Sequence, residues 1–146
     1  MYDYTYEAFL HDLEHLCTQV APFDPQIVLA VARGGVTLGH FLSERLGIRD
    51  LFTLNSIHYD GTRKMDRVEL FNIPPLPPHA RVLLVDDIVD SGETLREILS
   101  RLRERFPQTH FKSATLFTKP SACIQPDYSC KEATEWIRFF WNPPEE

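Results

Sequence analysis

The segment from Val82 to Thr94, VLLVDDIVDSGET, constrains the fold more than any other part of the chain. Its first four residues are aliphatic without polar alternation, which is typical of a parallel strand covered on both faces. Asp86 and Asp87 follow at the carboxyl end of that strand, where open α/β sheets bind ligands. Apolar residues then recur at helical spacing, at Leu95, Ile98, Leu99, Leu102 and Phe106. The segment therefore predicts a strand, a ligand-binding turn and a helix.

The turn between this strand and helix combines acids with a potential anion site. The residues Ser91-Gly92-Glu93-Thr94 open the predicted helix and offer free backbone N–H groups and hydroxyls to a phosphate. Carboxylates beside an anion site suit a ligand that carries both hydroxyls and a phosphate, such as ribose 5-phosphate. Taken alone, the pattern also fits a strand that merely ends in acids, with Ser91 serving as a helix N-cap.

The rest of the chain alternates strand and helix patterns. Helices are predicted over residues 6–20, ended by Pro22 and Pro25, and over 37–46, followed by a C′ glycine at Gly47. Strands are predicted over 26–32, 51–58, 68–71, 111–117 and 134–140, with a polar mobile loop over 60–67 and a proline-rich extended connector over 73–80. This alternation predicts an α/β fold, a single-domain twisted parallel sheet flanked by helices. With 146 residues, the chain suffices for one domain, residues 1–146.

Composition narrows the class of protein. No apolar stretch is long enough to span a membrane, and the acidic N-terminus lacks the basic region of a secretory signal. Three widely spaced cysteines fit a reducing compartment. The net charge of −6 argues against a general nucleic-acid surface, although an anionic substrate can still bind locally. We therefore expect a cytoplasmic protein that binds neither membranes nor nucleic acid.

The first predicted helix contains a possible zinc pattern. His11-Asp12-Leu13-Glu14-His15 matches the HxxEH sequence of one class of zinc peptidase. Both histidines share a helix face that points away from the apolar residues, and no third ligand is evident downstream. A solvated surface is the simpler interpretation of this face.

The full signature segment resembles the 5-phosphoribosyl-1-pyrophosphate (PRPP) signature of the type I phosphoribosyltransferases. The resemblance extends over residues 26–144 and is greatest to the short xanthine-guanine, or 6-oxopurine, subgroup. The motifs that carry it are AVARGG, the signature, FTKP, Asp127-Tyr128, TEWI and WNPP. It implies the type I fold with a flexible hood loop, Mg²⁺ as cofactor and assembly into a dimer or tetramer.

The resemblance also implies which residues bind PRPP. Without it, AVARGG reads most simply as a Gly-Gly turn beside a surface arginine, whereas in the family it is the pyrophosphate loop, often with a cis peptide that here would join Ala32 to Arg33. Asp86 and Asp87 would fix the ribose hydroxyls and bind the metal, and Glu93 would contribute its N–H. The implied PRPP-binding set is Arg33, Gly34, Asp86, Asp87, Asp90, Ser91, Gly92, Glu93 and Thr94.

The base site and the hood follow from the same resemblance. Asp90 would act as general acid/base at N7 of a 6-oxopurine, Lys119 would recognise O6, and Trp136 with Ile137 would hold the ring. On local grounds, Lys119 could equally be exposed to solvent and Trp136 part of the core. The hood loop would comprise His58, Tyr59, Arg63 and Lys64, although relatives have Ser-Tyr where this chain has His58-Tyr59.

The expected activity is transfer of ribose 5-phosphate from PRPP to guanine, xanthine or hypoxanthine, with release of pyrophosphate. Two alternatives remain, a PRPP-binding regulator without catalysis and an enzyme for another base. The preferred 6-oxopurine, the oligomeric state and the order of substrate binding stay open. Relatives commonly have Trp-Asp where this chain has Trp141-Asn142, so a second Mg²⁺ also stays open.

Overall fold

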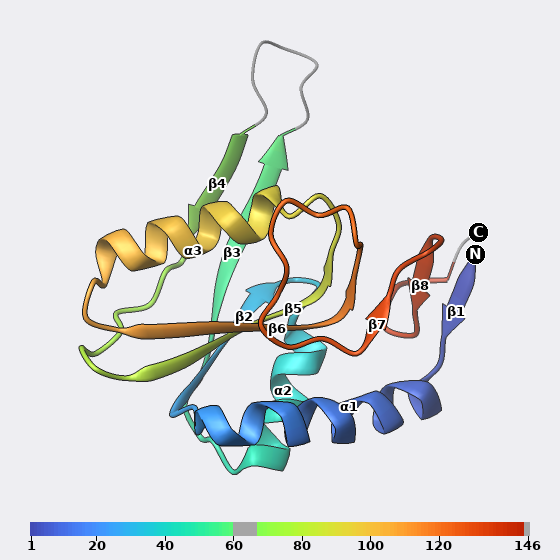
Figure 1. Cartoon of the computed structure of the whole chain (residues 1–146), viewed down its shortest axis with the longest axis horizontal. Helices are drawn as coiled ribbons and strands as arrows, with labels where there is room; N and C mark the ends of the chain where they lie inside the picture. The colour runs from blue at the N-terminus through green and yellow to red at the C-terminus, as the bar shows by residue number, and fades with distance from the viewer. Residues whose placement is uncertain (60–66, 145–146) are drawn as a thin grey trace.

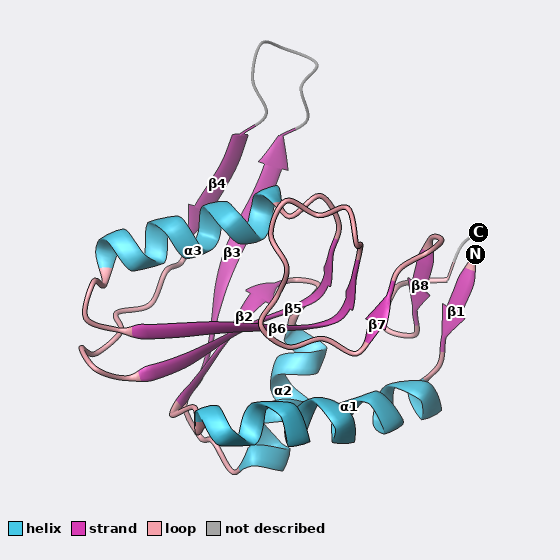
Figure 2. Cartoon of the chain, viewed as in Figure 1, coloured by secondary structure: helices cyan, strands magenta, loops and turns pink. Residues whose placement is uncertain are grey.

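A six-stranded sheet forms the centre of the protein, and the computed structural model describes it within residues 1–59 and 67–144. The strand order is β4-β3-β2-β5-β6-β7, and every neighbouring pair is parallel except β3 and β4 (Figures 1 and 2). The strands are β2 (Ile27–Ala32), β3 (Leu51–Tyr59), β4 (Arg67–Phe71), β5 (Arg81–Val89), β6 (His110–Thr118) and β7 (Lys131–Glu132). This arrangement confirms the expected α/β class and the returning strand over 68–71.

Helices cover the sheet on both faces. Helices α1 (Tyr6–Val20) and α2 (Val36–Leu46) lie below the sheet in Figure 1, and α3 (Glu93–Arg105) lies above it. The central strands feed two separate cores because their side chains alternate: Leu83 and Val85 pack with α1 and α2, whereas Val82 and Leu84 pack with α3. The aliphatic run of the signature segment is therefore explained by burial on both faces, as predicted.

Residues close in sequence determine where helices α1 and α2 begin or end. The hydroxyl of Thr5 accepts a hydrogen bond from the N–H of Ala8 at the start of α1, and the 3₁₀ turn η1 (Ala21–Phe23), with its proline, follows α1. Helix α2 ends at Gly47, whose left-handed conformation (φ 68°) confirms the predicted C′ glycine.

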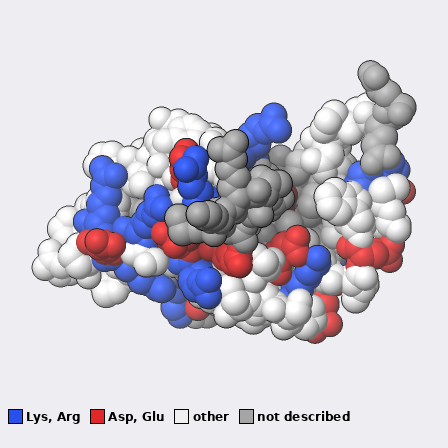
Figure 3. Space-filling view, turned by 90° about the horizontal axis from the view of Figure 1, so that it is seen from above, with Lys and Arg blue, Asp and Glu red and all other residues white. Residues whose placement is uncertain are grey.

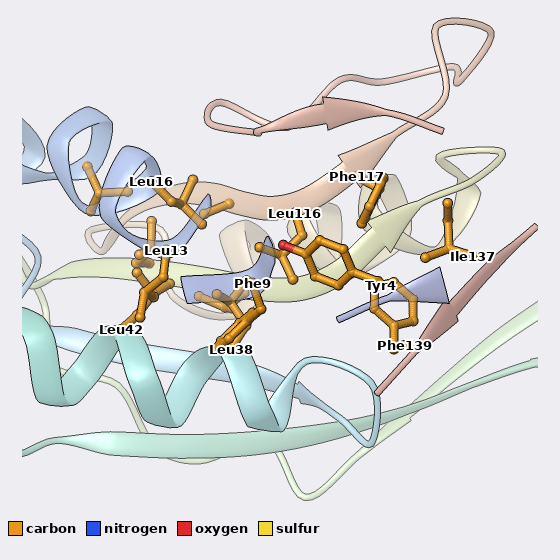
Figure 4. Packing of buried hydrophobic residues seen from close by; sticks show 14 of the residues in the cluster. Tyr4, Phe9, Leu13, Leu16, Leu38, Leu42, Leu116, Phe117, Ile137 and Phe139 are labelled. Carbon is orange, nitrogen blue, oxygen red and sulfur yellow. The ribbon is translucent and has the colours of Figure 1, made fainter. Parts of the chain in front are cut away.

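A second, two-stranded sheet joins the two ends of the chain. Strand β1 (Tyr2–Tyr4) pairs in parallel with β8 (Ile137–Phe139), so that the first and last strands lie side by side (Figure 1). Tyr4 is buried among aromatic rings here, with its ring centroid 5.0 Å from that of Phe117 and 5.8 Å from that of Phe139 (Figure 4). This aromatic cluster fixes the small sheet against the large one.

Three expectations about elements need correction. The final strand does not span residues 134–140: β8 has three residues and pairs with β1, because only its alternating buried side chains face the core. Strand β5 continues through both acids to Val89, since Asp86 and Ile88 still pair with β6. Strands β1 and β7 were not predicted.

Residues 60–66 of the expected mobile loop lie outside the described residues, and Arg67 already belongs to β4.

In the part of the chain that the structure describes, no helix combines the length and apolarity needed to cross a bilayer.

Candidate functional site

Two carboxylates lie half-buried near the carboxyl end of β5. Backbone N–H groups bind them: that of Asp87 donates to Asp86 Oδ1 at 2.8 Å, and that of Ile88 donates to Asp87 Oδ1 at 2.7 Å. Burial raises the pKa of Asp86 well above its usual value, and the charge of Asp87 adds to this increase. Burial also raises the pKa of Asp87, although hydrogen bonds with Asp86 and the backbone oppose it. The pair is a site of concentrated negative charge that a cation would stabilise.

The turn after β2 packs directly against these carboxylates. A Cβ on Gly34 would lie 2.5 Å from Asp87 Oδ2, and a Cβ on Gly35 would lie 2.4 Å from the carbonyl oxygen of Val85. Glycine is thus required for close approach at both positions. The peptide between Ala32 and Arg33 is cis, which confirms that expectation.

A cavity of about 430 Å³ lies beside the start of α3. Its walls include the whole predicted phosphate-binding turn, Ser91 to Thr94, together with Asp86, Asp90 and, from β3, His58. The helix begins at Glu93, so Gly92 and not Ser91 is the N-cap residue, which corrects the N-cap alternative. Ser91 Oγ accepts a hydrogen bond from the Glu93 N–H at 3.2 Å. This turn presents hydroxyls and backbone N–H groups at a helix start.

Gly92 makes the turn possible. Its φ is +88°, a conformation that residues with a side chain rarely adopt, and a Cβ there would lie 2.9 Å from the backbone nitrogen of Ile124. Across the cavity, His58 Nε2 lies 3.5 Å from Glu93 Oε2. His58 therefore contacts the first residue of α3 directly.

A second cavity, of about 520 Å³, adjoins the first. Its lining includes Asp90, Lys119, Trp136 and Ile137, which are the four residues predicted to meet the base. Lys119 Nζ lies 2.6 Å from Asp90 Oδ1, so the lysine is on the ligand side of the sheet and ion-paired. Trp136 is 74% exposed, which excludes the alternative that it belongs to the core, whereas Ile137 is buried. Asp90 lines both cavities and links them.

Some predicted site residues lie apart from these cavities. Arg33 is exposed at the end of β2 and lines neither of the two. The ring of Tyr59 lies 4.6 Å from the Arg67 guanidinium carbon, at the edge of the described hairpin. Arg63 and Lys64 fall outside the described residues. The pyrophosphate and hood contacts of these four residues therefore stay predictions.

Sequence reasoning assigned no site role to four polar residues that line the cavities, Thr115, Thr134, Glu135 and Asn142. Thr115 on β6 borders the first cavity, and its hydroxyl donates to the Phe117 carbonyl oxygen at 2.9 Å. Asn142 borders the second, and its Oδ1 accepts a hydrogen bond from the Phe139 N–H at 3.0 Å. The asparagine oxygen thus closes a turn. The apolar strand pattern around Thr115 gave no sign of its position, whereas Asn142 stood out only as a departure from the family.

The HxxEH pattern on α1 forms no metal centre in the described part of the chain, where no cluster of three potential ligands occurs. The side chain of His11 is 74% exposed, and its ring centroid lies 4.8 Å from that of His15. The solvated surface is therefore the correct interpretation of these histidines.

Lys and Arg side chains lie intermixed with Asp and Glu side chains on the upper face of the protein (Figure 3). A broad surface of this kind attracts a polyanion weakly, because acids offset the basic side chains.

Comparisons with known proteins agree with this geometry. Residues 8–146 match the family model described as a phosphoribosyl transferase domain. The xanthine-guanine phosphoribosyltransferase of Chromohalobacter salexigens is 30% identical over 90% of this chain and 77% of its own length. That of Idiomarina loihiensis is 30% identical over 79% and 70%, respectively.

Solved structures of phosphoribosyltransferases are also similar to this chain. The xanthine-guanine-hypoxanthine phosphoribosyltransferase of Helicobacter pylori is 42% identical, with a TM-score of 0.89 over 96% of this chain and 92% of that one. The purine phosphoribosyltransferase of Pyrococcus horikoshii is 27% identical, with a TM-score of 0.86 over 99% and 97%. The fold over nearly the whole chain is therefore shared with both.

Gly34→Ala tests whether the packed turn serves ligand binding. The new methyl group would displace the Asp87 carboxylate. Displacing a carboxylate that is expected to bind the metal commonly weakens binding at least about 10-fold, so we expect the affinity for PRPP with Mg²⁺ to fall by at least this factor. Gly47→Ala is the matched control, because it strains a left-handed residue with open space around it, remote from the cavities. It should lower the melting temperature and leave PRPP affinity, measured by calorimetry, unchanged. Equal loss of affinity in both variants would contradict the assignment.

Proposed function

The chain belongs to the phosphoribosyltransferase family, and on that premise we propose that it serves purine salvage by transferring ribose 5-phosphate from PRPP to N9 of guanine, xanthine or hypoxanthine. The observation that carries this proposal is the position of Asp90. It lies between a cavity built around an anion-binding turn and a cavity lined by a lysine and an exposed tryptophan. A sugar phosphate and a purine bound in these cavities would meet beside its carboxylate.

In this proposal, the first cavity holds the ribose 5-phosphate part of PRPP. The hydroxyls of Ser91 and Thr94 and the N–H groups of Gly92 and Glu93 bind the 5-phosphate at the start of α3. The carboxylate of Asp86, which lines this cavity, and that of Asp87, which lines the adjoining one, bind the ribose hydroxyls and stabilise the positive charge that develops on the ribosyl carbon. The imidazole of His58, on the opposite wall of this cavity, offers a further hydrogen-bond donor.

The residues at the end of β5 fit a magnesium ion. Two half-buried carboxylates with raised pKa values are oxygen ligands whose charge the surrounding backbone N–H groups only partly offset. Magnesium usually takes one or two carboxylates and completes its shell with water and substrate oxygens. Bound by Asp86 and Asp87, it would neutralise charge on the leaving pyrophosphate. Arg33, at the neighbouring turn, would bind the same group.

In the second cavity, the base takes its orientation from three side chains. Lys119 donates to O6, the indole of Trp136 stacks on the ring, and Ile137 closes the apolar wall. As N9 bonds to the ribosyl carbon, the bond from that carbon to the pyrophosphate oxygen breaks and its electron pair leaves with pyrophosphate. The base then carries one proton too many, and Asp90 accepts it from N7.

Several broader features belong to the same proposal. Residues 1–146 would form one phosphoribosyltransferase domain that assembles into a dimer or tetramer in the cytoplasm. The state of the thiols supports a reducing compartment, since Cys17, Cys123 and Cys130 are all free.

A PRPP-dependent assay of all three 6-oxopurines with Mg²⁺ tests the activity. Nucleotide and pyrophosphate should form from at least one of guanine, xanthine and hypoxanthine, whereas adenine and uracil should react poorly, because Lys119 offers a donor where adenine also has one. Binding of PRPP without turnover of any base would support a regulatory protein and contradict the proposal.

Asp90→Asn tests the proton acceptor. The amide keeps the shape of the side chain but cannot take a proton, so kcat should fall roughly 10²–10⁴-fold with PRPP affinity largely retained. Asp50→Asn is the control, an exposed acid at the opposite, amino-terminal edge of the sheet. If kcat of the Asp90 variant is unchanged in single-turnover measurements, another group takes the proton.

Lys119→Met tests recognition of the 6-oxo group. A hydrogen bond from a charged donor contributes about 1.5–3 kcal/mol, so kcat/KM for the 6-oxopurines should fall about 10- to 100-fold. The ratio of kcat/KM for a 6-oxopurine to kcat/KM for adenine should therefore decrease. Lys112→Met, near the amino end of the same strand, should change neither. Loss of PRPP binding with an intact base preference would instead assign Lys119 to a phosphate site.

A further inference from the structure

One charged side chain of α1 is buried on the side of the protein that joins the two sheets. Asp12 is only 3% exposed, although its neighbour His11 lies in solvent. Its Oδ2 accepts a hydrogen bond from the Tyr4 hydroxyl at 2.6 Å and lies 3.1 Å from Lys131 Nζ. A buried carboxylate without partners destabilises a folded protein, and the hydroxyl of Tyr4 and the ammonium of Lys131 are the partners of Asp12.

The cluster of Tyr4, Asp12 and Lys131 is charged and closely packed. Burial lowers the pKa of Lys131, but the hydrogen bond and the charge of Asp12 outweigh burial, so the pKa is raised overall. The ammonium also lies 5.5 Å from the ring centroid of Tyr4 and 5.9 Å from that of Tyr2. One ion pair and two contacts with aromatic rings therefore fix the position of Lys131.

Lys131 lies immediately before the segment that lines the second cavity. It begins β7, and residues 133–137 follow as cavity wall, including Trp136 and Ile137. The far end of this segment is fixed by the same part of the chain, because the Tyr2 N–H donates to the Trp136 carbonyl oxygen at 2.8 Å. The Ala133 N–H also donates to the Thr118 carbonyl oxygen at 2.9 Å, so β6 as well as Lys131 holds the near end of the segment. The exposed Trp136 side chain lines the cavity.

We propose that Tyr4, Asp12 and Lys131 are positioning residues for the purine, which hold segment 133–137 so that Trp136 and Ile137 meet the base. This inference rests on the proposed function and extends it, since none of the three lines the second cavity. Their removal loosens the base wall and leaves the PRPP turn, which lies on β5 and α3, in place.

Steady-state kinetics with both substrates varied tests the proposal. Lys131→Met should raise KM for the preferred 6-oxopurine about 10-fold, since misplacing a binding group by an ångström costs up to 10²-fold, and should leave KM for PRPP within about twofold. Lys131→Arg, which keeps the charge, should restore most of the base affinity. Tyr4→Phe removes only one hydrogen bond and should raise the same KM less.

Two further variants separate positioning from stability. The double variant Asp12→Asn/Lys131→Met removes both charges and keeps an acceptor for the Tyr4 hydroxyl, so it should fold yet still show the raised base KM. Leu102→Ala, a buried residue of α3 outside both cavities, should lower the melting temperature and change neither KM. Parallel changes of both KM values, or base KM values equal to wild type in a folded double variant, would overturn the proposal. An inactive wild-type protein would instead refute the proposed function.

Discussion

The close contact between the turn after β2 and the end of β5 is the constraint on which the site depends. Parallel pairing of these two strands brings their carboxyl ends together, and the lack of side chains at Gly34 and Gly35 lets the turn touch the Asp87 carboxylate and the Val85 carbonyl oxygen. Any side chain there would separate the loop proposed to bind pyrophosphate from the carboxylates proposed to bind the ribose and the metal. Two aliphatic strands, buried on both faces, make the contact rigid.

The two cavities share one acid, and this explains how a small protein can join two substrates. Asp90 leaves the sheet just after β5, so its carboxylate faces the anion turn of α3 on one side and Lys119 on the other. The ion pair holds both groups at the boundary where the new glycosidic bond would form. The proposed wall for the base comes from a different part of the chain, residues 133–137, of which Ile137 belongs to β8 of the small sheet.

The sequence was sufficient to predict the parts of the fold that rest on local pattern. The aliphatic runs of β2 and β5, the stripe of α3 and the glycine at position 47 each follow from short-range rules. The pairing of β1 with β8 was not predictable, because it joins residues at opposite ends of the chain. Asp12 was likewise hidden, since it follows an exposed histidine on an amphipathic helix and its partners come from distant strands. The exposure of Trp136 became clear only when the structure placed it at a cavity rim.

A crystal structure of the protein with PRPP and Mn²⁺ tests the central claim most directly, because the anomalous signal of manganese locates the cation. The account predicts the 5-phosphate against the backbone of residues 91–94, the ribose hydroxyls at Asp86 and Asp87, and the metal beside the same carboxylates. Density for the phosphate in the cavity of Lys119 and Trp136, or a cation bound away from the end of β5, would contradict it.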